Sequence, residues 1–489
     1  MVIKFNSFLR EEMSIYDIQK ALEQGEITSK ELIMYYLHRI ASYDQDGPMI
    51  NAMLEINPEA LFIAEALDEE RKSRGARGLL HGIPIVLKDN IETKDYMHTS
   101  AGTIALENFV ANEDAFLVKK LREAGAIILG KANMTELANS MSSTMWAGYS
   151  SRGGQTLNPY GDPTLFVGGS STGSAVAVAA NFSVLAIGTE TDASILSPAI
   201  QNSVVGIKPT VGLISRRGII PFTYAQDTAG PFARTVTDAA ILLGALTGVD
   251  KADSATYKSE RKSCEDYTSF LEVTGLKGAR IGVYNQGSDA YYDSGEYDAA
   301  LFHHAIQVMQ EQGAVVIEDI DISSFHREWK KGVLLHELKH SLDNFLINLP
   351  AHFPVHSMKE LIQFNQQTKV NSLKYGQDKL EMRQNIPNTL RNPDYLHAKL
   401  EDIYFSQDQG IDYTLKKYEL DAIVFPSYIG STISAKAGYP TIAVPAGYME
   451  SGRPFGISFA GNAFSEATLI KFAFSFEQAT KLRKSPQLH

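Results

Sequence analysis

Cysteine is almost absent from this sequence, which contains one in 489 residues. Because a disulfide needs two thiols, the lone Cys264 excludes an intramolecular disulfide, and it equally excludes thiolate zinc clusters and iron–sulfur centres. A chain of this length does not need such crosslinks to build a core, since 44% of its residues are hydrophobic and 21% are charged. We therefore expect a soluble globular protein.

Long apolar runs and an excess of positive charge are missing as well. The longest apolar run, near residues 175–188, is interrupted by Asn181 and Ser183 and is too short to cross a bilayer. No sustained apolar segment precedes the charges at Arg10 and Glu11, so we expect no signal peptide, no membrane partner and a cytoplasmic location. A formal net charge of −12 repels phosphate backbones, which disfavours nucleic acid as a partner. We expect a monomer or a homodimer.

Helical and strand-like patterns alternate along most of the chain. Residues 13–45 predict two helices, and a third is expected over 58–73. The second helix begins with a capping box made by Thr28 and Glu31. From about residue 80 to 250, short apolar runs bounded by glycine alternate with helical stretches, which favours an α/β sheet covered on both faces. The expected strands begin at residues 83, 126 and 184, and the expected helices are 115–124 and 174–180.

The C-terminal half predicts a helical insertion followed by a return to the sheet. Two strands starting at residues 279 and 314 flank an expected helix at 297–312, and residues 324–419 are helical and rich in charge. Strand-like runs then begin at 421 and 441, before a last helix at 463–483. We predict one domain over 1–489. Its parts are N-terminal helices (1–75), a core (76–250), a variable cap on the substrate side (251–420) and a C-terminal segment that completes the sheet (421–489).

Serine is concentrated in the glycine-rich stretch 168–174, which contains Ser170, Ser171 and Ser174. A serine in such a stretch is usually only a turn residue. The stretch also matches G-x-S-x-G around Ser171, the pattern of a hydrolase nucleophile elbow, which requires an acid and a histidine later in the chain. The match is short, and the neighbouring glycines and serines produce it easily.

Lys88 is the candidate base for a serine nucleophile, because a protonated hydroxyl reacts poorly without one. It ends the apolar run 83–87, where loss of water would lower the pKa of its ammonium group and leave a neutral amine that accepts a proton. The alternative is a lysine that reaches solvent or pairs with Asp89. On the residues alone, this alternative is the simpler interpretation.

His336 and His340 belong to a segment that fits H-E-x-x-H. On a helix, this spacing places two imidazoles on one face, as in zinc peptidases. No third ligand follows at a recognisable spacing, and two histidines four residues apart arise readily by chance. We expect no metal and no cofactor, and keep a zinc peptidase as a minor alternative.

Taken together, these segments resemble the amidase-signature family over nearly the whole chain, most weakly over 251–420. The sequence Thr-Glu-Thr-Asp at 189–192 and the sequence that follows Arg152 are similar to the branch with bacterial peptide amidases. The resemblance implies a single α/β domain with a central mixed sheet, and amide hydrolysis without a cofactor. The segments that carry it are 82–90, 130–138, 168–195, 205–212, 227–236, 437–447 and 464–467.

The resemblance also implies a set of site residues. Ser194 matches the nucleophile, Ser170 the bridging serine and Lys88 the base, and the two serines are 24 residues apart, as in the family. The peptide bond before the bridging serine is cis in this family, which predicts a cis Gly169–Ser170 bond. The oxyanion hole would be formed by the backbone N–H groups of Thr191, Asp192, Ala193 and Ser194.

One departure concerns the two residues before the nucleophile, which are commonly Gly-Gly in the family and are Asp192-Ala193 here. If position 193 needs a positive φ, alanine strains the loop and lowers the activity, whereas a negative φ makes it harmless. The substrate would be a small-molecule or peptide amide. Met145, Trp146, Ser171 and the loop 428–438 are candidate substrate contacts. Other hypotheses are an amidotransferase A-type subunit that hydrolyses glutamine in a tRNA-bound complex, and a binding protein that kept the fold.

Overall fold

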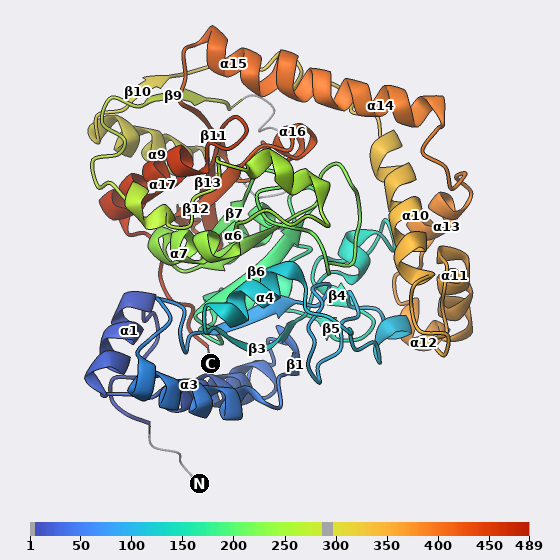
Figure 1. The fold of residues 1–489 in the computed structure, drawn as a ribbon. Helices are drawn as coiled ribbons and strands as arrows, with labels where there is room; N and C mark the ends of the chain where they lie inside the picture. Colours follow the sequence, from blue (N-terminus) through green and yellow to red (C-terminus); the bar gives the residue numbers. More distant parts are fainter. Residues whose placement is uncertain (1–4, 286–296, 489) are drawn as a thin grey trace.

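The computed structural model describes residues 5–285 and 297–488. Residues 1–4, 286–296 and 489 lie outside this part, and with them a piece of the predicted cap region. Within the described residues, an eleven-stranded sheet runs through the centre of the molecule in the order β1-β3-β2-β6-β8-β7-β12-β13-β11-β9-β10 (Figure 1). Its strands are β1 (Met53–Ile56), β2 (Pro84–Lys88), β3 (Ile127–Ala132), β6 (Leu185–Glu190), β7 (Val205–Lys208), β8 (Thr228–Ala233), β9 (Arg280–Val283), β10 (Val315–Ile317), β11 (Ala422–Pro426), β12 (Thr441–Tyr448) and β13 (Pro454–Ala460).

The sheet is mixed. Strands β3, β2 and β6 are parallel to one another, as are β11, β9 and β10, and the other neighbouring pairs are antiparallel. Every residue of β2, β3 and β6 is buried. Because both faces of these strands are covered, they appear in the sequence as continuous apolar runs rather than as alternating patterns. The predicted fold class, a single α/β domain with a central mixed sheet, is confirmed.

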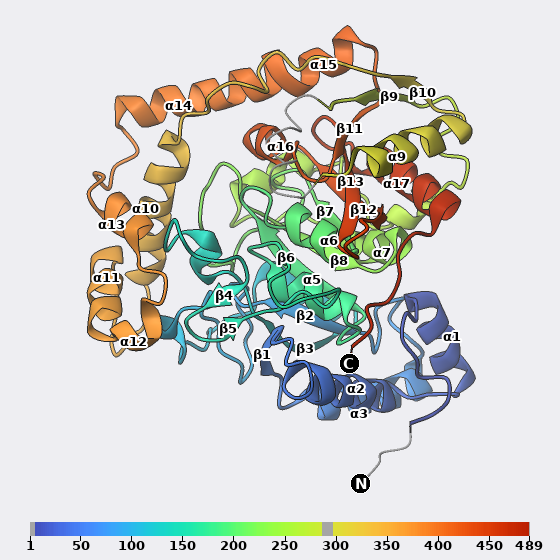
Figure 2. The same ribbon diagram turned by 180° about the vertical axis from the view of Figure 1, so that it is seen from behind.

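Helices cover both faces of the sheet. Helices α5 (Thr172–Ala179) and α6 (Leu196–Gln201) pack on the face nearer the viewer in Figure 2, and α4 (Phe116–Glu123) and α7 (Val236–Leu246) pack on the other. Helices α9 (Ala299–Glu311) and α17 (Glu466–Thr480) contact β12 and β13. The helices predicted in these places are confirmed, with ends that differ by one to three residues.

The N-terminal helices α1 (Ile15–Gln24), α2 (Ser29–Arg39) and α3 (Ala60–Arg74) lie near the edge of the sheet where β1 and then β3 stand (Figures 1 and 2). The predicted capping box is confirmed, because Thr28 Oγ1 accepts a hydrogen bond from the N–H of Glu31 at 3.1 Å and Glu31 Oε2 accepts one from the N–H of Thr28 at 2.8 Å. A π-helical turn, Ile40–Asp44, follows α2 and was not predicted.

A group of helices stands beside the sheet, on the right of Figure 1, within the predicted cap region. Leu338, Leu342 and Leu346 of α10 pack with Leu106 and Met134 in a hydrophobic cluster separate from the main core. Within the same predicted region, β9, α9 and β10 belong to the main sheet and its cover instead. The helices of the group are α10 (Gly332–Leu346), α11 (Met358–Gln367), α12 (Lys369–Ser372), α13 (Asp378–Gln384) and α14 (Pro393–Ile403).

The chain returns from α14 to the sheet through a π-helical segment, Tyr404–Ile411, and α15 (Asp412–Lys417). Helix α16 (Ser431–Ala437) then follows β11. A two-stranded hairpin of β4 (Tyr149–Ser150) and β5 (Gly154–Gln155) lies outside the main sheet. None of the helices in residues 5–285 and 297–488 combines the length and the apolar character that crossing a membrane requires.

Candidate active site

Three polar side chains from separate elements meet beside the ends of β2 and β6. Lys88 is the last residue of β2, Ser170 precedes α5, and Ser194 lies between β6 and α6. The Nζ atom of Lys88 donates to Ser170 Oγ at 2.8 Å, and Ser170 Oγ is 3.1 Å from Ser194 Oγ. Lys88 is fully buried. Ser194, at the other end of the row, is the most accessible of the three residues, with 8% of its surface exposed. The structure thus brings the three predicted residues together in one continuous row.

The two serines of the pair Ser170-Ser171 differ in their contacts. The Gly169–Ser170 peptide bond is cis, as predicted. The hydroxyl of Ser171 is held by the backbone of Thr189, since it donates to the carbonyl at 2.9 Å and accepts from the N–H at 3.1 Å. It also accepts from Lys88 Nζ at 3.0 Å. Ser171 contacts Ser194 through its backbone, since its N–H donates to the Ser194 carbonyl at 3.2 Å, but among the described residues no hydrogen bond joins the two hydroxyls. The position next to Ser194 is therefore taken by Ser170.

Lys88 lies in an environment that disfavours its charged form. Burial lowers the pKa of its ammonium group to about 7, although the negative charges of Glu190 and Asp227 act in the opposite direction. Its three hydrogen-bond acceptors are the hydroxyls of Ser170 and Ser171 and the carbonyl of Thr189. The simpler interpretation of the sequence, a lysine that reaches solvent or pairs with Asp89, is wrong because β2 delivers the side chain into the core.

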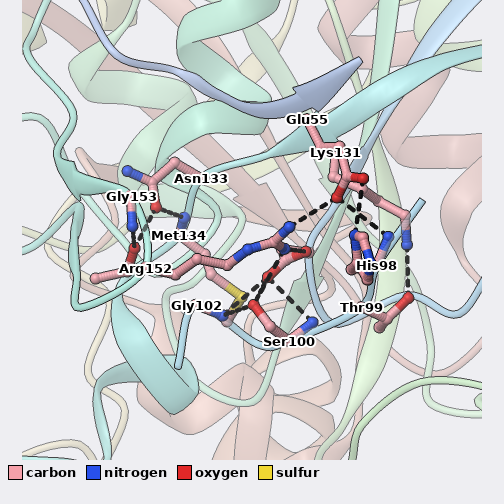
Figure 3. Close-up of polar contacts among 12 residues, drawn as sticks. Glu55, His98, Thr99, Ser100, Gly102, Lys131, Asn133, Met134, Arg152 and Gly153 are labelled. Atoms are coloured by element: carbon pink, nitrogen blue, oxygen red, sulfur yellow. Dashed lines mark hydrogen bonds and ion pairs between the residues drawn. The ribbon is translucent and has the colours of Figure 1, made fainter. Parts of the chain in front are cut away.

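The carboxylate of Asp89 takes part in a separate charge network, which links it to Arg152 and Glu55. Arg152 donates to Asp89 Oδ1 at 3.2 Å and to Glu55 Oε2 at 2.7 Å. Figure 3 shows the Arg152 guanidinium extending between Glu55 and the loop with Ser100 and Gly102. The N–H groups of Ser100 and Gly102 donate to Asp89 Oδ2 at 3.2 and 3.0 Å. The network therefore ties the residue after Lys88 to this loop.

The loop after β6 presents backbone N–H groups near Ser194. Within the part of the chain that the structure describes, the N–H groups of Asp192, Ala193 and Ser194 donate to no other protein group. Glu190, the last residue of β6, stabilises the next turn, because its Oε2 accepts from the N–H groups of Ile195 and Leu196 at 2.6 and 3.0 Å. The N–H groups of the loop are thus left available to an oxygen placed beside Ser194.

Ala193 has a φ of 60°, in the left-handed region that favours glycine. Of the two predicted alternatives, the strained one is therefore observed. Left-handed backbone costs an L-residue about 1–2 kcal/mol. The loop accepts this cost because its conformation is fixed from both sides, by Glu190 at the N–H of Ile195 and by Thr432 Oγ1, which donates to Asp192 Oδ2 at 2.9 Å. Thr432 belongs to the segment 428–438, which was predicted to be a loop that contacts the substrate but forms helix α16 over Ser431–Ala437 and does not line the cavity described below.

Thr191 is held by a second carboxylate, that of Asp227, which is partly exposed and was not predicted. Its hydroxyl donates to Asp227 Oδ1 at 2.6 Å, and its carbonyl accepts from Gln226 Nε2 at 3.0 Å. Asp227 Oδ2 also accepts from the N–H groups of Phe222 and Thr223 at 2.7 and 2.8 Å. Glu190 ends the buried strand β6 and Asp227 precedes the buried strand β8, which is a signal in the sequence. Their partners are mostly backbone groups, which no sequence pattern identifies.

A cavity of about 370 Å³ lies beside the end of β6, where Thr189, Glu190 and Thr191 line it. Much of its wall is apolar and comes from Met134, Leu137, Ile220, Phe222, Leu338 and Leu342. Its two arginines form ion pairs, Arg216 with Asp253 at 2.6 Å and Arg217 with Asp250 at 2.8 Å. Its carboxylates Glu190 and Asp227 accept hydrogen bonds from the protein instead. The cavity is at the lower end of the size range of ligand pockets.

The predicted substrate contacts Met145, Trp146 and Ser171 do not line this cavity. Met145 is nearly buried in the cluster of the cap helices, and Trp146 is half exposed. Ser171 is buried, and its hydroxyl is used by Lys88 and Thr189. The six residues named for the apolar wall come from three distant segments, around 134–137, 220–222 and 338–342, so no local sequence pattern identifies them.

The H-E-x-x-H segment lies on α10, away from the row formed by Lys88, Ser170 and Ser194. Glu337 is fully buried and accepts three hydrogen bonds, and His340 Nδ1 is 3.1 Å from the hydroxyl of Tyr224. In residues 5–285 and 297–488, no three His, Cys, Asp or Glu side chains gather in an arrangement that could hold a metal ion. The segment therefore acts as part of the packing between α10 and its neighbours.

The site thus combines a serine hydroxyl, a buried lysine and backbone N–H groups without partners among the described residues, which are the groups that acyl transfer needs. The chain matches the amidase family over residues 31–470, and so belongs to this family, the amidase-signature family that its sequence resembles. It is an amide hydrolase. A protein of Arabidopsis thaliana described as a probable amidase is 40% identical, over 99% of this chain and 93% of its own length.

Solved structures agree with this assignment. The native peptide amidase from Stenotrophomonas maltophilia is 41% identical, with a TM-score of 0.91, over 98% of this chain and 99% of that one. The A-type subunit of the glutamyl-tRNA(Gln) amidotransferase of Caldanaerobacter subterraneus is more distant, at 31% identity over 97% of this chain and 98% of its own length. The corresponding subunit from Thermotoga maritima, 24% identical with a TM-score of 0.71 over 99% of this chain and 100% of that one, shares the fold.

Proposed function

We propose that the protein hydrolyses a carboxamide to a carboxylate and ammonia through an acyl-enzyme on Ser194, with Ser170 and Lys88 relaying the proton. The observation that carries this proposal is the buried row in which Lys88 Nζ is 2.8 Å from Ser170 Oγ, and Ser170 Oγ is 3.1 Å from Ser194 Oγ. These distances are within the reach needed for proton transfer between a nucleophile and its base.

The relay works in both directions. Neutral Lys88 takes the proton of Ser170 while Ser170 takes that of Ser194, and the oxygen of Ser194 bonds to the amide carbon. The tetrahedral intermediate then breaks its C–N bond, and the proton on Lys88 returns through Ser170 to the leaving nitrogen, which departs as ammonia. Water gives a proton to the same relay, attacks the acyl carbon and releases the carboxylate, after which the proton returns to Ser194.

The negative charge on the intermediate would be stabilised by the backbone N–H groups of the loop Thr191–Ser194. The N–H groups of Asp192, Ala193 and Ser194 have no partner within the described residues, which supports this role. One donor of this kind typically contributes about 3 kcal/mol to transition-state stabilisation. A loop held by Glu190 and Asp227 needs little reorganisation during the reaction, so its donors act at full strength.

The test measures ammonia release from aliphatic, aromatic and peptide amides. We expect Ser194→Ala to abolish turnover and Lys88→Ala to come close to doing so, because no other buried base reaches Ser170 among the described residues. Ser174→Ala is the matched control, since Ser174 belongs to the same glycine-rich stretch but donates to the carbonyl of Ile187 instead. A Lys88→Ala enzyme with a near-normal rate would contradict the relay.

The apolar wall of the cavity favours an amide substrate whose group next to the carbonyl is apolar and uncharged. Lys88, Ser170 and Ser194 do not line the cavity themselves, and Thr189, Glu190 and Thr191 connect it to the loop that carries Ser194. Burying one apolar side chain of the substrate contributes about 1.5–3 kcal/mol. An amide whose side chain enters the cavity should therefore have a kcat/KM roughly tenfold to a hundredfold higher than one whose side chain stays in water. The test compares peptide amides with leucine, phenylalanine or aspartate at the C-terminal position. The preference for leucine and phenylalanine amides over the aspartate amide should fall when Leu342→Asp places a charge in the wall. Equal kcat/KM values for leucine and aspartate amides would contradict this assignment.

Peptide amides are favoured as substrates because a peptide amidase is among the similar solved structures, at 41% identity. The second candidate, an amidotransferase A-type glutaminase, is favoured only by relatives near 31% identity. Glutaminase activity that appears only with a partner subunit would reverse this order. We also propose that the protein acts without nucleic acid, membrane or cofactor, as a monomer or a homodimer. The cytoplasmic location stays a prediction.

A further inference from the structure

Glu337 of α10 is a buried carboxylate that has no part in the proton relay. It is fully buried, and its three hydrogen-bond donors come from two directions. On one side, Oε1 accepts from the hydroxyl of Tyr395 at 2.8 Å and from Lys399 Nζ at 2.9 Å, both on α14. On the other side, Oε2 accepts from the backbone N–H of Ala225 at 2.9 Å. Glu337 therefore joins the cap helices to the turn 222–227.

The same turn holds the start of the proposed oxyanion loop. Asp227 accepts from the hydroxyl of Thr191 at 2.6 Å, and Gln226 donates to the carbonyl of Thr191 at 3.0 Å. Both residues directly follow Ala225, the residue that Glu337 holds. A displacement of the turn would thus move Thr191, and with it the N–H groups that follow.

Other contacts between α10 and the turn lie beside Glu337. Ser341 Oγ donates to the carbonyl of Phe222 at 2.9 Å, and His340 Nδ1 is 3.1 Å from the hydroxyl of Tyr224. Tyr224 and His340 are partly exposed, and the hydroxyl of the buried Ser341 also bonds within α10, to the carbonyl of Leu338 at 3.3 Å, whereas the Ala225 contact is made by a fully buried carboxylate. A buried acceptor has no water to replace a lost partner, so its geometry is more strictly fixed than that of an exposed one.

We propose that Glu337 is a positioning residue for amide hydrolysis, which fixes the turn 222–227 and through it the oxyanion loop. The H-E-x-x-H segment thereby couples the cap helices to the reacting centre without a metal. This inference rests on the proposed function, because it assumes that the N–H groups after Thr191 stabilise the oxyanion. Displacements of about 1 Å in such a site lower the rate by about a hundredfold.

The test replaces Glu337 by glutamine, which keeps the size of the side chain but cannot accept at both oxygens. We expect Glu337→Gln to lower kcat by about tenfold or more while KM for a small amide changes by less than about threefold, because the lost stabilisation belongs to the transition state. The affinity for a peptide aldehyde, which forms a tetrahedral adduct with a serine, should fall in parallel with kcat. The affinity for a non-reactive competitive ligand should not.

Tyr395→Phe is the matched control. It removes one donor from the same carboxylate and destabilises the same contact between α10 and α14, but leaves the bond to Ala225 in place. We expect it to lower the melting temperature and to keep kcat within about twofold of the original. If Glu337→Gln does not fold, Glu337→Asp takes its place, since the shorter carboxylate withdraws from the turn but keeps its charge beside Lys399.

Two results would overturn the inference. One is a folded Glu337→Gln or Glu337→Asp enzyme whose kcat equals that of the original protein. The other is an equal loss of kcat in Tyr395→Phe, which would reduce Glu337 to a stabilising contact. The proposed function fails separately, if Ser194→Ala keeps its activity, whatever the Glu337 variants do.

Discussion

Lowering the pH should inactivate the protein by protonating Lys88. Burial brings the pKa of this lysine from its ordinary value of 10.5 to about 7. At pH 7, about half of the molecules then carry the neutral amine that the relay requires, against about one in 3,000 for an exposed lysine with the ordinary pKa. Without this shift, the base would be present in too few molecules to support turnover near neutral pH.

The sign of the pH dependence follows from the protonation state that reacts. The neutral amine is lost as the pH falls, so kcat/KM should drop by about tenfold for each unit below pH 7 and reach a plateau about one unit above it. The measurement is the initial rate of ammonia release between about pH 5 and 9 at constant ionic strength, with circular dichroism to show that the fold persists. A flat profile between about pH 5 and 8 would refute the reasoning.

Glu190 provides the control that identifies the titrating group. Burial raises the pKa of this carboxyl to about 7 as well, so its protonation could produce a similar profile. Its negative charge favours the ammonium form of Lys88. Glu190→Gln removes that charge and keeps one acceptor oxygen for the loop, so the midpoint of the profile should move to lower pH. If kcat/KM of Glu190→Gln no longer depends on pH, the titrating group is the carboxyl of Glu190 instead.

The remaining predictions concern the loop, the charge network and the histidine segment. Ala193→Gly should stabilise the fold by about 0.5–1 kcal/mol, because it removes the cost of left-handed alanine and adds a smaller cost in chain entropy; urea unfolding measures this, and a lower stability would contradict it. Arg152→Met should destabilise the fold by about 3 kcal/mol and lower kcat/KM, since it removes the ion-pair partner of the buried Asp89. Thermal unfolding measures the stability and ammonia release measures kcat/KM, and an unchanged melting temperature would exclude a structural role for this pair. Treatment with a chelator should leave ammonia release unchanged, and His340→Ala should change it by less than about twofold, because neither affects the proposed proton relay. A loss of ammonia release that added zinc restores would support the zinc peptidase hypothesis.

Sequence patterns predicted the strands whose burial is simple, whereas β1, β7, β8 and β13 of the main sheet were not predicted. The residues of β2 and β6 are covered on both faces, so apolar runs bounded by glycine identify them. The capping box of α2 was equally clear, since both of its partners lie within four residues. Helix ends were less certain, and the π-helical turn Ile40–Asp44 was missed because it depends on tertiary packing.

The candidate site was predictable only as a joint pattern. Lys88 taken alone suggests a lysine paired with Asp89, and Ser170 taken alone suggests a turn residue. The family resemblance placed both, together with Ser194, and the structure brings them within hydrogen-bonding distance. The supporting carboxylate Asp227 was missed because its partners are N–H groups of a turn and the hydroxyl of a distant residue. Such contacts leave no periodic signal.

The order of strands in the sheet has a consequence for how the chain is made. Strand β7 pairs with β12, which is more than 200 residues later and therefore leaves the ribosome long after it. Until then, a half-sheet that already carries the residues of the relay exposes the edge of β7. Such an edge is open to pairing with other chains. Truncation after α14 should therefore give an aggregating product rather than a smaller enzyme, and a chaperone that binds nascent chains should raise the yield of the full-length protein.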